Sequence, residues 1–159
     1  MGKTYKGDTL GKGLRIGIAV SRFNEQVTAL LLEGALEGLN ANGVSKYNVD
    51  IAWTPGALEL PIVAKQMAGS GRYDAIVCLG AVIRGETAHF DYVSAGAQQG
   101  VVKAGLDTGV PILFGVLTTE DVAQAMERSG GKKGNKGFDA AVGAIEMANL
   151  LKSLPGSYG

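Results

Sequence analysis

The chain has 159 residues, of which 46% are hydrophobic, and this length suits one domain with a core large enough to fold without disulfides. Its 15 basic and 15 acidic side chains balance, so charge gives no reason to expect a nucleic acid or an anionic membrane as partner. One cysteine and one histidine exclude an intrachain disulfide and a zinc site made of these ligands.

The expected compartment follows from the cysteine and from the apolar runs. The single Cys78 favours a reducing compartment. The longest apolar run, at residues 75–83, is far shorter than the roughly 20 residues that span a bilayer. Residues 1–6 have no apolar core of the kind found in signal peptides. We therefore expect a cytoplasmic protein.

The first half of the chain alternates between patterns typical of strands and of helices. Short apolar or alternating runs predict strands at residues 15–20, 47–53 and 75–79. Between them, apolar residues recur at helical spacing and predict helices at residues 27–39 and 62–67.

The second half continues this alternation. A helix is predicted at residues 89–106, followed by a fourth strand at 112–117. The spacing of Thr118 and Asp121 resembles a capping box that opens a short helix ending at residue 128. A loop rich in lysine and glycine, residues 130–137, then leads to a last helix at 139–154.

Four strands that alternate with helices predict a single-domain, flavodoxin-like three-layer sandwich, with a four-stranded parallel sheet and helices on both faces. Ligands of such sheets bind outside the carboxyl ends of the strands. Unusual residues occupy all four loops that leave those ends, at residues 21–24, 54–59, 80–93 and 114–119. These loops are the first indication of a functional site.

The third loop holds the only histidine of the chain. If a helix begins near Gly85-Glu86-Thr87, its N–H groups and dipole favour an anion such as phosphate, whereas plain capping by Thr87 needs no ligand. His89 suits either a proton relay or a structural position. An anion site next to a proton shuttle favours the elimination of phosphate from a sugar-like substrate.

Other side chains in these loops also have two interpretations. Phe23 suits either stacking on a planar ring or packing against a helix. Glu59 suits either a favourable contact with a helix dipole or the hydroxyls of a polyol. The basic loop does not match a Walker motif, and it suits either plain solvation or contact with an anion. The basic side chains of this loop are Lys132, Lys133 and Lys136, and Arg128 lies just before it.

An ordered set of motifs closely resembles the 6,7-dimethyl-8-ribityllumazine synthases, over residues 5–154. The motifs lie at residues 21–24, 55–61, 80–93, 114–119, 127–130 and 134–137. The resemblance implies a transferase of the penultimate step of riboflavin biosynthesis that needs no cofactor or metal. It would condense 5-amino-6-ribitylaminouracil with 3,4-dihydroxy-2-butanone 4-phosphate and release phosphate and water.

The resemblance also implies a role for each matching position. The pyrimidine and ribityl chain would contact Phe23, Asn24, Ala57, Leu58, Glu59, Val82, Ile83 and Phe114. Phosphate binding would fall to Gly85, Glu86, Thr87 and Arg128. The catalytic residues would be His89, Arg128 and Lys136, with Asp139 as an orienting acid.

In that family the site lies between subunits, so Phe23, Arg128 and Lys136 need not share a site with His89 of their own chain. The resemblance implies a homo-pentamer, and the short loop at 129–137 favours an icosahedral shell of pentamers, with riboflavin synthase as a candidate partner. Residues 1–14 would form an N-terminal arm that pairs with a neighbouring subunit, and 155–159 a flexible tail around the 15–154 domain.

Two alternatives remain at this point: a non-catalytic flavin- or lumazine-binding or shell-forming protein, and a pentameric riboflavin synthase. A passive binder needs neither His89 nor a phosphate-anchoring Arg128, and a riboflavin synthase of this kind takes no phosphorylated substrate. The combination of His89, Arg128 and a phosphate site therefore favours the lumazine synthase reaction.

Overall fold

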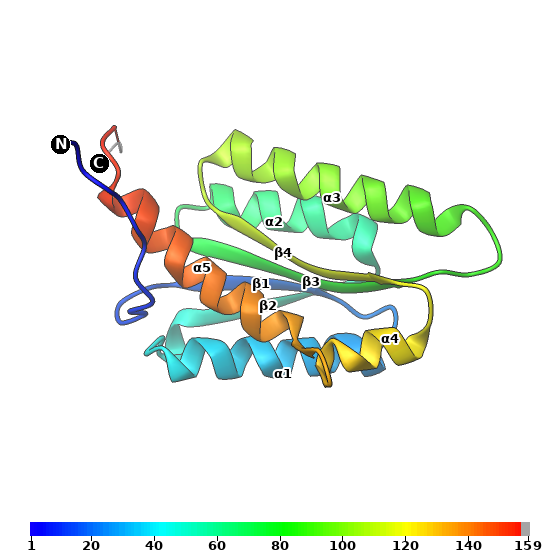
Figure 1. The fold of residues 1–159 in the computed structure, drawn as a ribbon. Coiled ribbons are helices and arrows are strands. Elements are labelled where there is room, and N and C mark those ends of the chain that lie inside the picture. Colours follow the sequence, from blue (N-terminus) through cyan, green and yellow to red (C-terminus); the bar gives the residue numbers. More distant parts are fainter. Residues whose placement is uncertain (157–159) are drawn as a thin grey trace.

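The computed structural model describes residues 1–156. Of the predicted tail at 155–159, residues 157–159 lie outside this part. Its centre is a parallel four-stranded sheet with the order β2-β1-β3-β4 (Figure 1). The strands are β1 (Ile16–Ser21), β2 (Val49–Thr54), β3 (Ala75–Ile83) and β4 (Ile112–Thr119).

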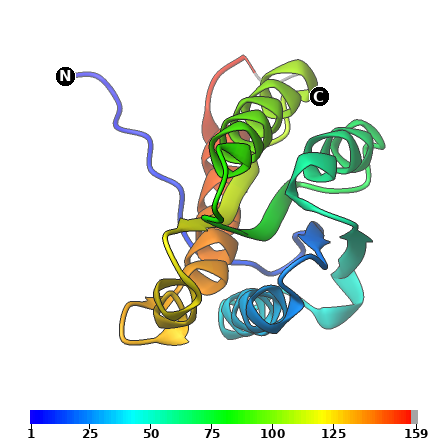
Figure 2. The same ribbon diagram turned by 90° about the vertical axis from the view of Figure 1, so that its right-hand side faces the viewer.

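Helices cover both faces of the sheet, and the predicted flavodoxin-like three-layer fold is confirmed (Figures 1 and 2). One face carries α1 (Glu25–Ala41), α4 (Val122–Glu127) and α5 (Lys136–Ser153), and the other carries α2 (Leu60–Gly69) and α3 (His89–Thr108). Within residues 1–156, none of the helices combines the length and apolarity needed to cross a membrane.

The prediction for β3 was too short, because Gly80 does not end the strand. β3 pairs with β4 as far as Ile83 opposite Thr119. A Cβ atom on Gly80 would lie 3.0 Å from the Ser21 hydroxyl, so the glycine permits a close approach within the sheet. The functional loop therefore begins at residue 84 rather than at residue 80.

The predicted capping box was assigned to the wrong residue. Thr118 lies in β4, and α4 begins after Asp121, whose Oδ1 accepts a hydrogen bond from Gln124 N at 2.8 Å. The Gln124 amide oxygen in turn accepts from Glu120 N at 2.8 Å, so the two side chains cap the helix reciprocally. The cap is thus shifted by three positions along the chain.

Three further segments differ from the prediction. The expected start of the second strand forms a 3₁₀ turn, η1 (Lys46–Asn48), before β2. The expected basic loop is an antiparallel hairpin of β5 (Ser129–Gly131) and β6 (Gly134–Asn135). α5 follows the hairpin directly at Lys136, three residues before the predicted start, because Asn135 caps it.

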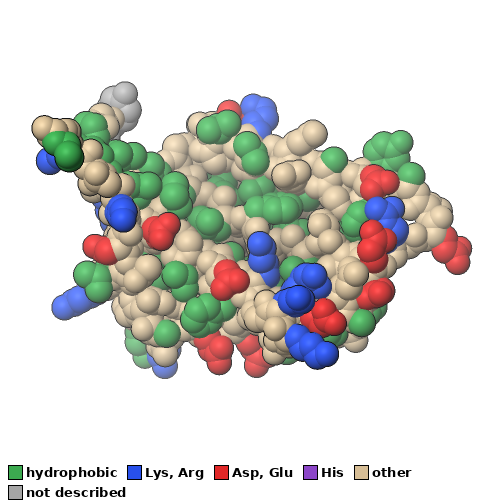
Figure 3. All heavy atoms as spheres, viewed as in Figure 1, with side chains coloured by type: hydrophobic (Ala, Val, Ile, Leu, Met, Phe, Trp, Pro, Cys, Tyr) green, Lys and Arg blue, Asp and Glu red, His purple; other side chains and the backbone are tan. Residues whose placement is uncertain are grey.

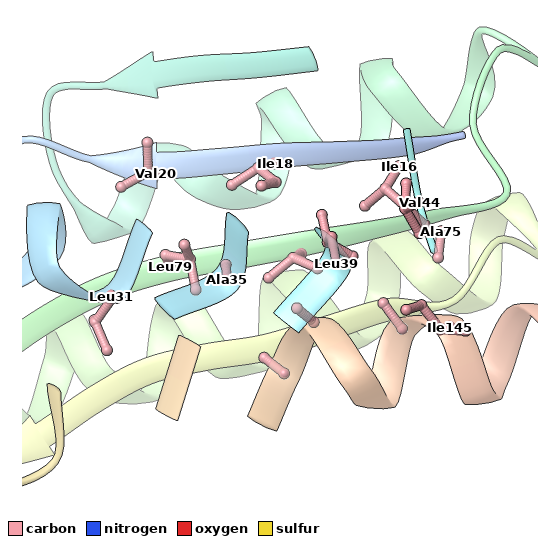
Figure 4. Packing of buried hydrophobic residues seen from close by; sticks show 14 of the residues in the cluster. Ile16, Ile18, Val20, Leu31, Ala35, Leu39, Val44, Ala75, Leu79 and Ile145 are labelled. Atoms are coloured by element: carbon pink, nitrogen blue, oxygen red, sulfur yellow. The ribbon is translucent and has the colours of Figure 1, made fainter. Parts of the chain in front are cut away.

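Two apolar clusters hold the layers together. The first lies between the sheet and helices α1 and α5, where Ile18, Leu31 and Ile145 are fully buried (Figure 4). The second lies between the sheet and helices α2 and α3 and includes Leu60 and Val101. Because side chains of β1 and β3 enter both clusters, these strands are covered on both faces, as their continuous apolar sequences predict.

Helices α1 and α5 cross with their backbones in close contact at Asn135. Its Oδ1 accepts from Gly137 N at 2.8 Å and Phe138 N at 3.1 Å, and its Nδ2 donates to Leu30 O at 3.0 Å. A Cβ atom on Gly34 would collide with the Asn135 side chain. One asparagine thus caps α5 and fixes it against α1, which sets the position of the first turn of α5.

Residues 1–14, the predicted arm, form no strand, and the beginning of this segment extends away from the helices (Figure 2). Its second half is tied to α5, since Asn149 Nδ2 donates to Asp8 O at 3.1 Å and to Leu10 O at 3.0 Å. Gly11 N also donates to Asn42 O at 2.7 Å. Residues 1–6 are exposed.

We expect Asn135→Ala to lower the free energy of unfolding by about 2 kcal/mol, because it removes a helix cap and leaves the partly buried Leu30 carbonyl without its donor. Urea unfolding of the purified protein measures this loss. Asn40→Ala, at an exposed position of α1, is the matched control and should change stability by less than about 0.5 kcal/mol. Equal effects of the two substitutions would contradict the role of Asn135.

Candidate functional site

A cavity of about 510 Å³ opens at the carboxyl ends of β1 and β3. The chain leaves β1 toward one edge of the sheet and β3 toward the other, so the cavity lies at the switch point of the strand order, where ligands of such sheets bind. Its volume falls in the range of small-molecule sites, about 300–1,000 Å³. The lining residues are Phe23, Asn24, Pro55, Gly56, Ala57, Leu58, Glu59, Ala81, Val82, Ile83, Gly85, Thr87, His89, Phe90 and Val93.

The first wall of the cavity is the turn between β1 and α1. Phe23 N donates to Pro55 O at 3.2 Å, which holds the turn against the loop after β2. Asn24 has a left-handed backbone with φ of 61°, and its Nδ2 donates to Ala81 O at 2.9 Å. Phe23 is 69% exposed in the single chain and lines the cavity, so it is not packed under a helix of its own chain.

The second wall is the short 3₁₀ turn η2 (Ala57–Glu59) between β2 and α2. Thr54 Oγ1 donates to Gly56 O at 2.9 Å and fixes the start of this turn. Glu59 is exposed, and its Oε1 lies so close to Gly56 that a Cβ atom there would be 3.0 Å away. The carboxylate therefore lies over the turn at the rim of the cavity.

The third wall is the loop between β3 and α3. Residues 84–89 are exposed, and α3 begins at His89 after Ala88, which has no side chain able to cap it. Thr87 Oγ1 accepts a hydrogen bond from His89 N at 3.3 Å, so capping by Thr87 satisfies this one N–H group. Gly85 and Thr87 line the cavity, whereas Glu86 does not. The positive end of the 20-residue helix α3 is thus directed at the cavity.

His89 is exposed and lines the cavity, so it does not occupy a position in the core. Phe90 and Val93 of the same helix also line the cavity, and neither was predicted as a site residue. Val93 lies four residues after His89 and so shares its helix face, a spacing from which it could have been found.

A second depression, of about 380 Å³, lies at the β4 edge of the sheet, beside α5 and the hairpin. Basic side chains gather at this end of the molecule (Figure 3). Arg128 Nη1 donates to Gln124 O at 3.0 Å and lies 3.7 Å from Glu127 Oε2. The lining residues are Val116, Leu117, Thr118, Thr119, Arg128, Lys133, Lys136 and Asp139.

The structure divides the predicted site residues between these two hollows. Phe23 and His89 share the cavity, whereas Arg128, Lys136 and Asp139 line the depression. Across residues 1–156, no lining residue is common to both hollows. Phe114 lines neither of them, because its half-buried side chain packs against the second apolar cluster.

The only thiol takes no part in this site. Cys78 lies in the middle of β3 and is fully buried, and desolvation raises its pKa to about 12. A protonated, inaccessible thiol is not a nucleophile. Glu59 and His89 are the titratable side chains among the residues that line the cavity.

A flavodoxin-like sheet whose switch point carries a cavity lined by an imidazole and a helix N-terminus defines an α/β protein with a small-molecule site. In a comparison with known protein families, residues 13–152 match the family described as 6,7-dimethyl-8-ribityllumazine synthase. Because the match covers most of the chain, the protein belongs to this family of transferases. Its reaction is the condensation that forms 6,7-dimethyl-8-ribityllumazine in riboflavin biosynthesis.

We expect Cys78 to react with a thiol reagent only when the sheet unfolds, because the reactive species is an exposed thiolate. Absorbance after addition of a chromogenic disulfide, with and without denaturing urea, measures the reaction, and Cys78→Ala gives the background. The raised pKa also predicts a free energy of unfolding that falls as the pH rises from 9.0, the ordinary value of the thiol, toward about 12. Complete labelling of the native protein within seconds would contradict this assignment.

Proposed function

We propose that the active site forms between two copies of the chain, with the cavity of one copy facing the depression of the next. The division of the assigned residues between two hollows supports this proposal, because neither hollow holds the complete set. Different patches that meet in this way form a head-to-tail interface, which closes into a ring when the rotation between copies divides a full turn. The ring that we propose is a pentamer.

In this site the cavity side binds the pyrimidine substrate. Phe23 stacks on the ring, as its exposed face allows. Backbone groups of Ala57, Val82 and Ile83 pair with the polar edges of the ring, and the Glu59 carboxylate accepts hydrogen bonds from ribityl hydroxyls. Asn24 and Leu58 complete this side, while Phe114 contributes from the neighbouring copy.

The phosphate of the second substrate binds at the start of α3. Backbone N–H groups of Gly85, Glu86 and Thr87 face it, and Arg128 of the neighbouring copy neutralises its charge. The exposed position of the Glu86 side chain is compatible with this role, since only its backbone is needed. Lys136 contacts the substrates from the same side, and Asp139 orients the basic groups.

His89 moves protons during imine formation, elimination of phosphate and ring closure. The observation that carries this assignment is the presence of the imidazole and of the α3 N-terminus in one cavity. General acid–base catalysis of this kind contributes about 10²–10⁴-fold. Orientation of the two substrates supplies the remaining rate enhancement, because two bound and oriented substrates react as if they were parts of one molecule.

The single copy also leaves apolar surface that an assembly would cover. Ile62 of α2 is 71% exposed and Leu106 of α3 is 80% exposed. β2 is an edge strand with exposed Ile51 and Trp53, and we propose that residues 1–14 of a neighbouring copy pair with it. The short hairpin at 129–135 supports further assembly of pentamers into an icosahedral shell, with riboflavin synthase as a partner in the cytoplasm.

The test of this function is a direct assay with purified protein and both substrates. Lumazine fluorescence and released phosphate are followed together, beside the uncatalysed mixture. We expect equal amounts of both products, well above the background. A well-folded assembly that gives only the background rate would overturn the proposed site.

For His89→Ala we expect kcat to fall by about 10–100-fold, because proton transfer is lost while the orientation of the substrates is kept. His89→Gln, which keeps a polar side chain but has no titratable ring, should show the same loss. Sedimentation should show an unchanged assembly for both variants, since residue 89 is exposed. Retention of the full rate by either variant would contradict the catalytic role.

For Arg128→Ala we expect KM for the butanone phosphate to rise about 10–100-fold, because a charge-assisted hydrogen bond to the phosphate is lost. The matched control is Lys132→Ala. It removes an exposed cation from the hairpin that follows Arg128, and Lys132 does not line the depression. Steady-state kinetics with each substrate varied in turn measure the effect. An unchanged KM in the Arg128 variant would rule out its contact with the phosphate.

A further inference from the structure

Arg84 links two segments that lie far apart in the sequence. It follows β3 directly, and its Nε lies 2.8 Å from Glu120 Oε2 in the turn between β4 and α4. Its Nη2 lies 3.5 Å from Asp91 Oδ1 in the first turn of α3. The backbone is fixed as well, because Arg84 N donates to Thr119 O at 2.9 Å.

The same guanidinium lies over a ring that lines the cavity. The Arg84 Cζ atom is 4.4 Å from the centroid of the Phe90 ring, a distance typical of a cation–π contact. Phe90 follows His89 directly and lines the cavity with it. Arg84 therefore contacts the two residues after His89, and it holds them against the end of β4.

We propose that Arg84 is a positioning residue of the reaction, which fixes the first turn of α3, and with it His89 and the phosphate-binding loop, against the turn between β4 and α4. This inference rests on the proposed function of His89 and of residues 85–87. It adds a residue that contacts no substrate and acts through the helix that it holds. An arginine suits this task, because its planar, forked group can pair with carboxylates and stack on a ring at once.

Two alternatives for Arg84 are weaker. As a phosphate ligand it would need a free positive charge, but Asp91 and Glu120 give the cluster a net negative charge. As a source of stability it would contribute little, because its side chain is 39% exposed and exposed ion pairs are weak. The contacts of Arg84 thus matter for the geometry of α3.

The first test is Arg84→Gln, with Arg72→Gln as the matched control. Arg72 is also exposed and pairs with a carboxylate, Asp50, away from both hollows. We expect Arg84→Gln to lower kcat/KM for the butanone phosphate by about 10–100-fold, as a small misplacement of reacting groups does. KM for the pyrimidine substrate should change by less than about 3-fold, since its contacts lie on the other two walls and on the end of β3, which pairing with β4 holds in place. Arg84→Lys should restore only part of the loss.

A charge-matched variant separates positioning from simple electrostatics. Arg84→Gln alone leaves two carboxylates near the phosphate loop and makes the cluster more negative. The double variant Arg84→Gln/Glu120→Gln has the net charge of the original cluster but lacks the contact between the two segments. We expect it to remain as impaired as Arg84→Gln, and recovery of the rate would overturn the inference.

Hydrogen exchange tests the same inference without turnover. We expect the amides of residues 92–95, which make the first hydrogen bonds of α3, to exchange about 10-fold faster in Arg84→Gln than in the original protein, and not in Arg72→Gln. Unchanged exchange, or kcat/KM within about 2-fold of the original, would overturn the role of Arg84. Absence of turnover in the original protein would instead overturn the proposed function, and exchange would still test the helix position.

If Arg84→Gln does not assemble, Glu120→Gln carries the test, because it removes the shortest ion pair of the cluster and keeps Arg84 and Asp91. Faster exchange at residues 92–95 with a lower kcat/KM would support the inference. Native-like values of both in this variant would overturn it.

Discussion

The hydrogen bond from Asn24 to Ala81 O joins the two strands on which the whole site depends. β1 and β3 lie side by side, and their chains leave in opposite directions, so a crevice must open between them at their carboxyl ends. The left-handed backbone of Asn24 turns the chain sharply into α1 and leaves Phe23 at the rim. The predicted residues of the cavity are placed by the ends of these two strands, by the loops that follow them and by the turn η2 after β2.

A second constraint separates the basic residues from this cavity. Asn135 fixes the start of α5 against α1, and the glycines at 34 and 137 let the two backbones meet. Lys136 and Asp139 are therefore held at the β4 edge, together with Arg128 from the end of α4. The two hollows of one chain thus hold different sets of the predicted residues, and from this division we infer a site shared between copies.

Much of the fold could be predicted from the sequence, because its strands and helices have clear apolar periods. The errors arose at residues whose role depends on tertiary contacts. Gly80 suggested the end of a strand, but it makes room for Ser21. Thr118 suggested a cap, but pairing with β3 keeps it in β4.

The candidate site was predicted as a set of residues but not as an arrangement. The motifs identified Phe23, Glu59 and His89, which the structure brings together, yet no spacing could show that Arg128 lies in another hollow. Phe114 was placed by its motif in the pocket, whereas in the single chain it packs into the core. Arg84 was not assigned at all, because its partner Glu120 is distant in sequence and only the pairing of β3 with β4 brings them close.

The most direct measurement of the shared site is complementation between two inactive variants. One variant carries Phe23→Ser with His89→Ala, and the other carries Arg128→Ala with Lys136→Ala. Each is purified, and the two are mixed in equal amounts under conditions that dissociate and reform the assembly. If the site lies between copies, about a quarter of the interfaces in mixed rings are fully native, so about a quarter of the original activity should return. A mixture that is no more active than its two components would show that the site does not form between copies.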